Sequence, residues 1–166
     1  MQRMSSTGVR LPYKPVYAIA TGTVKAASED ESANGKCVII EHTTGKGRKY
    51  YSYYCHLDSI SVNVGQTISV RGQAIGVMGK TNNTPAGQDN RMVEHVHISI
   101  TRDNVGVRFY GYNRDVNDNY KSMTTASGVT PDFYEMNCKI PKMNTRYYNP
   151  TAYFTQGESL IDNNYN

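Results

Sequence analysis

The sequence contains no tryptophan and only three phenylalanines, but it has fourteen tyrosines. Most of its aromatic side chains therefore carry a hydroxyl group, which suits a sheet protein with a polar, hydrogen-bonding surface. No apolar run approaches the ~20 residues that a membrane-spanning helix needs, so we expect no membrane span. The opening residues, MQRMSSTGVRLPY, contain no apolar stretch, so we expect no signal peptide. If the protein acts outside a cell, something other than its own leader must carry it there.

A concentrated basic patch is also missing. The formal net charge is +4, without a dense cluster of lysine and arginine, so we expect no nucleic-acid partner. With 166 residues the chain fits one domain and can bury a core without metal or disulfide staples.

Cysteines are few and odd in number: Cys37, Cys55 and Cys138. An odd count without a CxxC pair argues against a disulfide framework or a structural zinc knuckle. Buried free thiols are the interpretation that the count favours. One bridge, such as Cys37 to Cys138, stays open.

Short segments rich in strand-forming residues follow one another closely, with almost no helical periodicity. Glycine-bearing turns such as SANGK and TTGKGRK separate them. This pattern predicts an all-β fold with an antiparallel sandwich or barrel-like core. We expect these segments at residues 16–27, 36–42, 50–57, 59–81 and 93–101.

The second part of the chain is patterned more weakly. Residues 103–146 are rich in Asn, Tyr, Thr and Met and indicate a long insertion with one short hairpin at GVRFYGY. The segment YYNPTAYF (147–154) is expected to dock back onto the core. We assign residues 1–102 and 147–155 to the domain core, and 156–166 to a frayed tail.

Two of the four histidines share one strand-like segment, EHVHISI. Because side chains at i and i+2 of a strand face the same side, His95 and His97 should project together, with Val96 and Ile98 facing away. A single strand histidine is more often a hydrogen-bonded structural residue. A pair on one face indicates metal binding or acid–base chemistry, since imidazole serves both.

The other two histidines lie in YYCHL and IIEHTTG. Alternation puts Tyr54 on the same face as His56, a plausible pair for orienting a water or an oxyanion. For Tyr54 alone, a satisfied structural tyrosine is a strong competing interpretation. His42 stands at a strand end before a turn, where we expect a surface histidine.

These motifs, in the order PVYAIATGTV, CVIIEHTTG, YYCHLDSISVNVGQTISVRGQAIGVMGKT and EHVHISI, resemble the lysostaphin/LytM-type zinc endopeptidases that cut peptidoglycan cross-bridges. The resemblance covers about Pro15 to Ile100, and YYNPTAYF is similar to the family's closing segment. It implies a zinc cofactor with His97 as a ligand. It also implies catalytic roles for His95, which would position or deprotonate the attacking water, and for His56, which would help to stabilise the oxyanion.

One motif of that family is missing. Two further zinc ligands normally come from His-x-x-x-Asp shortly before the first strand. Without a gap these positions fall on Arg3 and Thr7, and with a one-residue gap on Met4 and Gly8. No Asp, Glu or His precedes Glu29. Because a catalytic zinc normally has three protein ligands and a water, His97 alone should not hold it.

Three explanations are open: a pseudoenzyme, a fragment whose ligands lie in another polypeptide, or replacement by distant acids. Candidates for such acids, Glu29, Asp30 and Asp89, lie in loops and are better interpreted as ordinary polar turns.

Two main functions follow. The first is a zinc-dependent peptidoglycan endopeptidase, impaired or incomplete as it stands. The second is a non-catalytic module that binds the cell wall or a protein partner, for example within a phage tail or virion. A carbohydrate-binding β-module using tyrosines as stacking platforms ranks last, because it does not explain the histidine pair. In either main case the protein would face the cell wall or belong to a virion.

Overall fold

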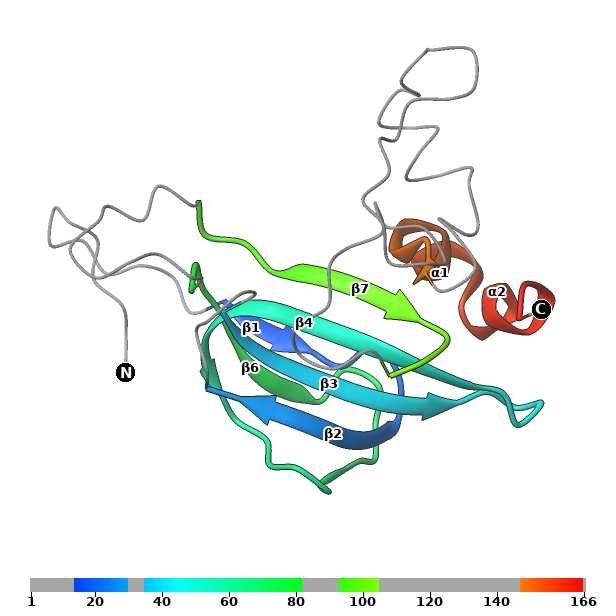
Figure 1. Cartoon of the computed structure of the whole chain (residues 1–166), viewed down its shortest axis with the longest axis horizontal. Helices are drawn as coiled ribbons and strands as arrows, with labels where there is room; N and C mark the ends of the chain where they lie inside the picture. The colour runs from blue at the N-terminus through cyan, green and yellow to red at the C-terminus, as the bar shows by residue number, and fades with distance from the viewer. Residues whose placement is uncertain (1–13, 30–34, 82–92, 105–146, 166) are drawn as a thin grey trace, which may run out of the picture.

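The sheet is built around one long strand, β4. The computed structural model describes residues 14–29, 35–81, 93–104 and 147–165. The strand order is β1-β6-β4-β3-β2-β5, with β7 pairing to β4 and β8 pairing to β7. All pairings are antiparallel. The sheet curls, and two short helices lie beside the end of β7 (Figure 1). The strands are β1 (Pro15–Tyr17), β2 (Gly22–Ser28), β3 (Lys36–Thr43), β4 (Lys49–Ile60), β5 (Thr67–Ile68), β6 (Ala74–Met78), β7 (His97–Thr101) and β8 (Tyr147–Tyr148).

This architecture confirms the all-β, lysostaphin-type fold that the sequence predicts. The core fills the concave side of the sheet with β-branched and aromatic side chains, which pack well on a pleated surface. Among its largest fully buried members are Tyr50, Tyr54, Ile40, Ile75 and Ile100.

The end of the chain is helical and buried, so the expectation of a frayed tail is wrong. Helix α1 (Pro150–Gln156) begins at Asn149, whose side chain caps the first turn by accepting hydrogen bonds from two backbone N–H groups. Helix α2 (Glu158–Asn163) follows directly and buries Leu160 and Ile161 completely in the core. These two apolar side chains hold the end of the chain against the sheet.

Two polar contacts also join the helices to the sheet. The Tyr50 and Tyr153 hydroxyls are 2.7 Å apart, and the Thr44 hydroxyl donates to Asp162 Oδ1 at 2.7 Å. The terminal segment therefore docks on β4 and on the β3–β4 turn.

Cys37 and Cys55 form a disulfide between β3 and β4, with their Cα atoms 4.4 Å apart. The interpretation of both as free thiols is therefore wrong, as is a bridge from Cys37 to Cys138. The two cysteines become neighbours because β3 and β4 pair antiparallel across the turn at residues 44–48. They form a second small cluster with Ile39 and Tyr53 on the sheet face opposite the main core. Cys138 and the hairpin expected at GVRFYGY lie outside the described residues.

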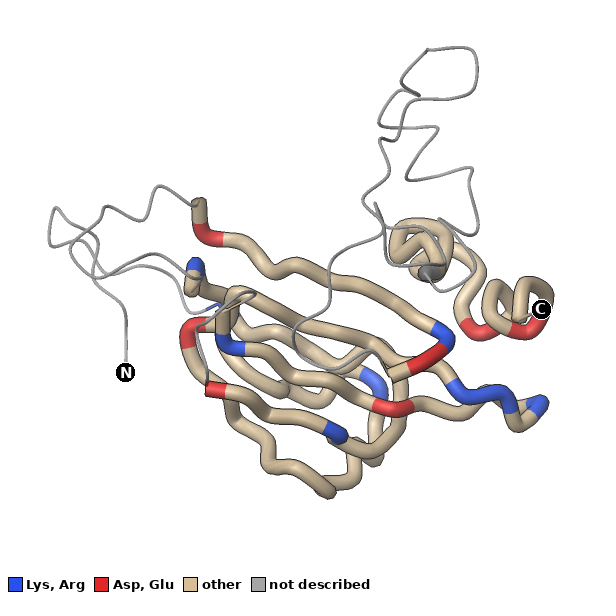
Figure 2. The backbone as a smooth tube through the Cα atoms, viewed as in Figure 1, with Lys and Arg blue, Asp and Glu red and all other residues tan. Residues whose placement is uncertain are grey.

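Charged residues are scattered over the described part of the chain (Figure 2). Basic residues gather at the tip of the β3–β4 hairpin, where Arg48 stacks on the Tyr165 ring and Lys49 contacts Glu41. In the described ranges, none of the helices is long and apolar enough to cross a membrane.

Candidate functional site

His56 lies where β4 changes partner. On one edge of β4, Tyr51–Cys55 pair with β7 and Leu57–Ile60 pair with β6. His56 falls between the two ladders and has a positive φ of 63°. It is the one non-glycine residue with positive φ in the described parts of the chain. Such a backbone conformation is costly for a residue with a Cβ, so it marks a position that the surrounding structure enforces.

The unusual backbone places His56 beside the two histidines of EHVHISI. Cys55 pairs directly with His97 and Tyr54 with Ile98, so His97 lies on the Cys55 side of the sheet. Strict alternation would send His56 to the opposite, Tyr54 side. Instead, the His56 ring centroid is 4.8 Å from that of His95 and 5.9 Å from that of His97. The three imidazoles converge, but a break in alternation brings them together.

Hydrogen bonds to backbone carbonyls orient two of the rings. His56 Nδ1 lies 2.8 Å from the Thr81 carbonyl oxygen, and His95 Nδ1 lies 2.8 Å from that of Val93. A carbonyl oxygen only accepts, so each neutral ring carries its proton on Nδ1 and leaves a lone pair on Nε2. His95 is further fixed by an isolated bridge to Gly79, with its backbone N–H donating to the Gly79 carbonyl at 3.0 Å.

The third ring, His97, is half-buried, with Nε2 2.9 Å from the Ser99 hydroxyl. Burial, and to a lesser degree His56 and His95 as potential positive charges, together lower the pKa of His97 to about 4. Burial also lowers the pKa of His56, partly offset by the hydrogen bond to Thr81. At neutral pH both rings are therefore uncharged, the form in which imidazole accepts hydrogen bonds or binds metal.

Thr81 fixes the surroundings of His56. Its carbonyl accepts the His56 Nδ1 proton, while its hydroxyl donates to the Leu57 carbonyl at 2.7 Å and accepts from the Lys36 N–H at 2.9 Å. Gly35, at φ +66°, leaves room for it, since a Cβ there would collide with the Thr81 backbone. Thr81 thus ties β3, β4 and the His56 ring together. The sequence analysis did not single it out, because a threonine after a glycine-bearing segment carries no marker of its own.

Tyr54 is placed elsewhere. Its hydroxyl lies inside the core, accepts from the Ile19 N–H at 2.9 Å and is 3.1 Å from the Ser52 hydroxyl. Burial raises its pKa to about 12. The structure therefore does not bring the Tyr54 hydroxyl to the three imidazoles, and its contacts are those of a satisfied structural tyrosine.

His42 belongs to the same buried network, so the expectation of a surface histidine is wrong. Its side chain is 1% exposed, with Nδ1 2.7 Å from the Thr21 carbonyl and Nε2 2.7 Å from the Ser52 hydroxyl. The segment at residues 18–21, between β1 and β2, covers this end of β3. Burial lowers the pKa of His42 to about 4.

The residues that the structure describes do not fit a resident zinc ion. Among the residues that the structure describes, no group of three His, Cys, Asp or Glu side chains is arranged to hold a metal. The two missing family ligands cannot come from residues 1–28, which contain no His, Asp or Glu. Glu29, one of the acids considered as a replacement, is exposed and forms an ion pair with Lys36 at 2.9 Å. Asp30 and Asp89 lie outside the described residues.

Comparisons with known proteins bear on this geometry. A profile of Peptidase family M23 matches residues 5–109. No curated protein sequence matches the chain. Among solved structures, the chain is similar to the catalytic domain of the antimicrobial peptidase lysostaphin from Staphylococcus simulans, with 25% identity over 53% of this chain and 58% of that one, at a TM-score of 0.41.

Two further structures are similar over comparable parts. A zinc-containing peptidase from Vibrio cholerae is 25% identical, covering 60% of this chain and 30% of that one, at a TM-score of 0.38. The catalytic domain of a mutant of the prophage-encoded M23 protein EnpA from Enterococcus faecalis is 19% identical, covering 55% and 62%, at a TM-score of 0.43. The chain thus spans less than two thirds of the length of each of these three structures. The family profile covers more than half of the chain, residues 5–109, and the protein therefore belongs to Peptidase family M23.

Proposed function

We propose that this domain recognises bacterial peptidoglycan and, in the form given by its sequence, does not hydrolyse the peptide cross-links. Family membership and the convergence of His56, His95 and His97 support a peptidoglycan-directed site. One observation carries the second half of the proposal: the positions that should supply two further zinc ligands hold neither His nor Asp. Imidazoles alone provide no adequate electrophile for hydrolysing an unactivated amide.

The three rings still suit the binding of a peptide backbone. With Nδ1 donating to a carbonyl, the Nε2 atoms of His56 and His95 are the ring positions that can accept a hydrogen bond from a peptide N–H. Because carbonyl oxygens hold both rings in place, this acceptor pair is preorganised and loses little side-chain entropy on binding.

Hydrolysis remains the second candidate, and it requires that the missing ligands be supplied. The observation in its favour is that the three histidines converge, and that backbone carbonyls fix the tautomers of His56 and His95. A variant carrying Arg3→His with Thr7→Asp, or Met4→His with Gly8→Asp, restores the family pattern in either possible register. Zinc uptake and cross-link cleavage by one of these double variants would show that the loss of two zinc ligands is the sole reason why the site does not hydrolyse cross-links.

The test combines metal analysis, binding and turnover on the purified chain. We expect far less than one zinc per chain by elemental analysis, co-sedimentation with purified peptidoglycan, and no release of soluble fragments. About one tightly held zinc per chain, together with fragment release, would replace the proposal by the hydrolase function. A chain that stays in the supernatant would remove peptidoglycan as the ligand and favour a protein partner, such as a phage tail or virion component.

The matched control for binding is His42→Gln. His42 is buried away from the three imidazoles, whereas His56→Gln and His95→Gln change the proposed acceptors. We expect the latter two to weaken co-sedimentation and the control to leave it unchanged in folded protein.

A further inference from the structure

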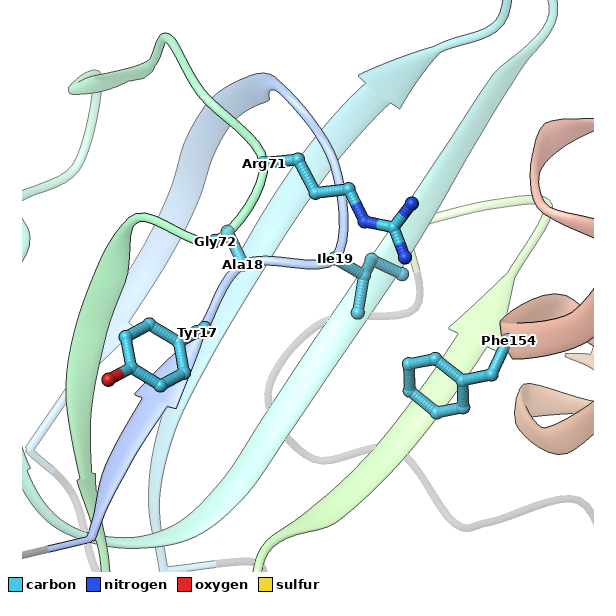
Figure 3. A pocket seen from close by; sticks show the side chains of 6 residues that line it. All are labelled: Tyr17, Ala18, Ile19, Arg71, Gly72 and Phe154. Atoms are coloured by element: carbon cyan, nitrogen blue, oxygen red, sulfur yellow. The ribbon is translucent and has the colours of Figure 1, made fainter.

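A second concave site lies between the end of β1 and helix α1. It has a volume of about 400 Å³, within the range of small-ligand sites, and its walls are Tyr17, Ala18, Ile19, Arg71, Gly72 and Phe154. Figure 3 shows the Arg71 side chain reaching over Ile19 toward Phe154. This cavity shares no residue with the histidine site.

Of the described residues in the wall of this cavity, Arg71 alone is charged. Within the described ranges of the chain it makes no ion pair or hydrogen bond. A guanidinium presents donors in a planar fork that matches a carboxylate, so an anionic ligand is the natural complement of this site.

The rest of the wall is apolar and partly open. Tyr17 is 51% exposed and Phe154 is 53% exposed, whereas Ala18 and Ile19 are buried beneath them. Exposed aromatic side chains beside a buried aliphatic floor favour a small apolar group next to the anion.

A neighbouring hollow limits the charge of the ligand. It is lined by both Arg71 and Glu158, and Glu158 accepts a hydrogen bond from the Tyr50 hydroxyl at 3.2 Å. A carboxylate that lines the same hollow as the guanidinium disfavours a phosphate or a polyanion, which would bring excess negative charge toward Glu158. A single carboxylate fits better.

We propose that the Arg71 cavity binds a carboxylate carried next to a small apolar side chain, as at the C-terminus of a peptide. Free ends of peptidoglycan stem peptides, which are D-alanine carboxylates, have this chemistry, and so do ordinary protein C-termini. The carboxylate assignment is independent of the proposed function, whereas the cell-wall source rests on it.

The position of the cavity fits a role beside the histidine site. The backbone carbonyl oxygen of Lys14, just before β1, accepts a hydrogen bond from the Met78 N–H. Met78 is adjacent to the bridge between Gly79 and His95. Tyr17 is three residues further along, roughly 10 Å at the rise of an extended chain. A cell-wall ligand that engages both sites would therefore have to extend along β1, from the bridge at His95 to Arg71.

The test is a chemical-shift titration of the isotope-labelled chain with N-acetyl-D-Ala-D-Ala, its C-terminal amide and the all-L peptide. We expect millimolar binding of the acid, with shifts at Arg71 and Phe154, and no comparable binding of the amide. Arg71→Ala should weaken binding about tenfold or more, Arg71→Lys less, and Phe154→Ala severalfold. Arg102→Ala, a half-buried arginine paired with Asp103, is the matched control and should bind like the unaltered chain.

Each outcome decides one point. Preference for the D-peptide over the L-peptide assigns the cavity to cell-wall stems, and equal binding assigns it to peptide C-termini in general. Equal binding of acid and amide, or unchanged binding by Arg71→Ala, would overturn the carboxylate site. The titration needs neither metal nor turnover, so failure of peptidoglycan co-sedimentation with retained peptide binding would count against the proposed function alone.

Discussion

Replacing Thr81 with valine should loosen both the sheet and the His56 ring. The substitution keeps the shape of the side chain and removes the hydroxyl. The Leu57 carbonyl then loses a donor at 2.7 Å and the Lys36 N–H loses an acceptor at 2.9 Å. Each such hydrogen bond contributes about 1 kcal/mol net, and an unsatisfied buried group costs more. We expect the free energy of unfolding to fall by ~2 kcal/mol, which corresponds to a Tm roughly 4–8 °C lower for a chain of this size.

The assay is chemical denaturation with the disulfide intact, accompanied by NMR of the imidazole nitrogens. The control is Thr67→Val, at an exposed position of β5, which should change stability by less than about 0.5 kcal/mol. The His56 Nδ1 proton, held by the Thr81 carbonyl, should exchange faster in Thr81→Val than in the control. Equal stabilities of the two variants, or an unchanged His56 signal, would refute the assignment of Thr81 as the residue that positions His56.

Three further predictions follow from the same structure. Arg3→His combined with Thr7→Asp should raise bound zinc from near zero toward about one per chain, as measured by elemental analysis, and no gain in either possible register would count against ligand loss as the sole defect. Protonation of buried His42, whose folded pKa is about 4 against an ordinary 6.5, is unfavourable in the fold. The unfolded chain therefore binds more protons at this position between these values, so the contribution of His42 to stability should fall as pH drops from 6.5 to 4, by roughly 3 kcal/mol. Denaturation at several pH values should show a smaller fall for His42→Gln, and an identical fall would contradict the burial effect. Reducing the Cys37–Cys55 disulfide, which closes a loop of 18 residues in sequence separation, should lower stability by about 3 kcal/mol. Thiol titration of the unreduced, unfolded chain should find one free cysteine, and three would show that the bridge is absent.

The sheet could be predicted because its segments alternate and are separated by glycine-bearing turns. The helices could not be predicted from periodicity, since α1 and α2 are only seven and six residues long. A local signal was nevertheless present: Asn149 before Pro150 is a capping residue followed by the residue best suited to the first helical position. Gly157, at φ +62°, then separates the two helices.

The errors on His42 and on the cysteines share one physical cause. Both depend on which strands become neighbours, and a single strand does not reveal that. His42 is buried because Thr21 and Ser52 close around its ring, and Cys37 meets Cys55 because of the register between β3 and β4. Neither the burial of His42 nor the pairing of Cys37 with Cys55 could be predicted from residue type and local pattern.

Alternation predicts that His95 and His97 project together, yet alternation along β4 would place His56 on the other face of the sheet. Cys55 and Tyr54 fix opposite faces of β4, and only the left-handed backbone at His56 brings its ring to His97. Such a conformation costs roughly 1–3 kcal/mol and persists only when its surroundings enforce it. Here the change of partner from β7 to β6 and the hydrogen bond to Thr81 enforce it.

A consequence concerns how activity can be lost in this domain. If sheet pairing and Thr81 assemble the imidazole cluster, removing two zinc ligands near the N-terminus leaves the cluster in place. The presence of His56, His95 and His97 is then not by itself a sign of catalysis, because the fold arranges them in either case. Adding the two ligands back changes the metal site, whereas Thr81→Val changes the support of His56 and the sheet contacts of the Thr81 hydroxyl. If the variant with restored ligands gains zinc and the variant that also carries Thr81→Val does not, metal binding depends on the support of His56. If both variants bind the same amount of zinc, the metal site and the support of His56 are independent.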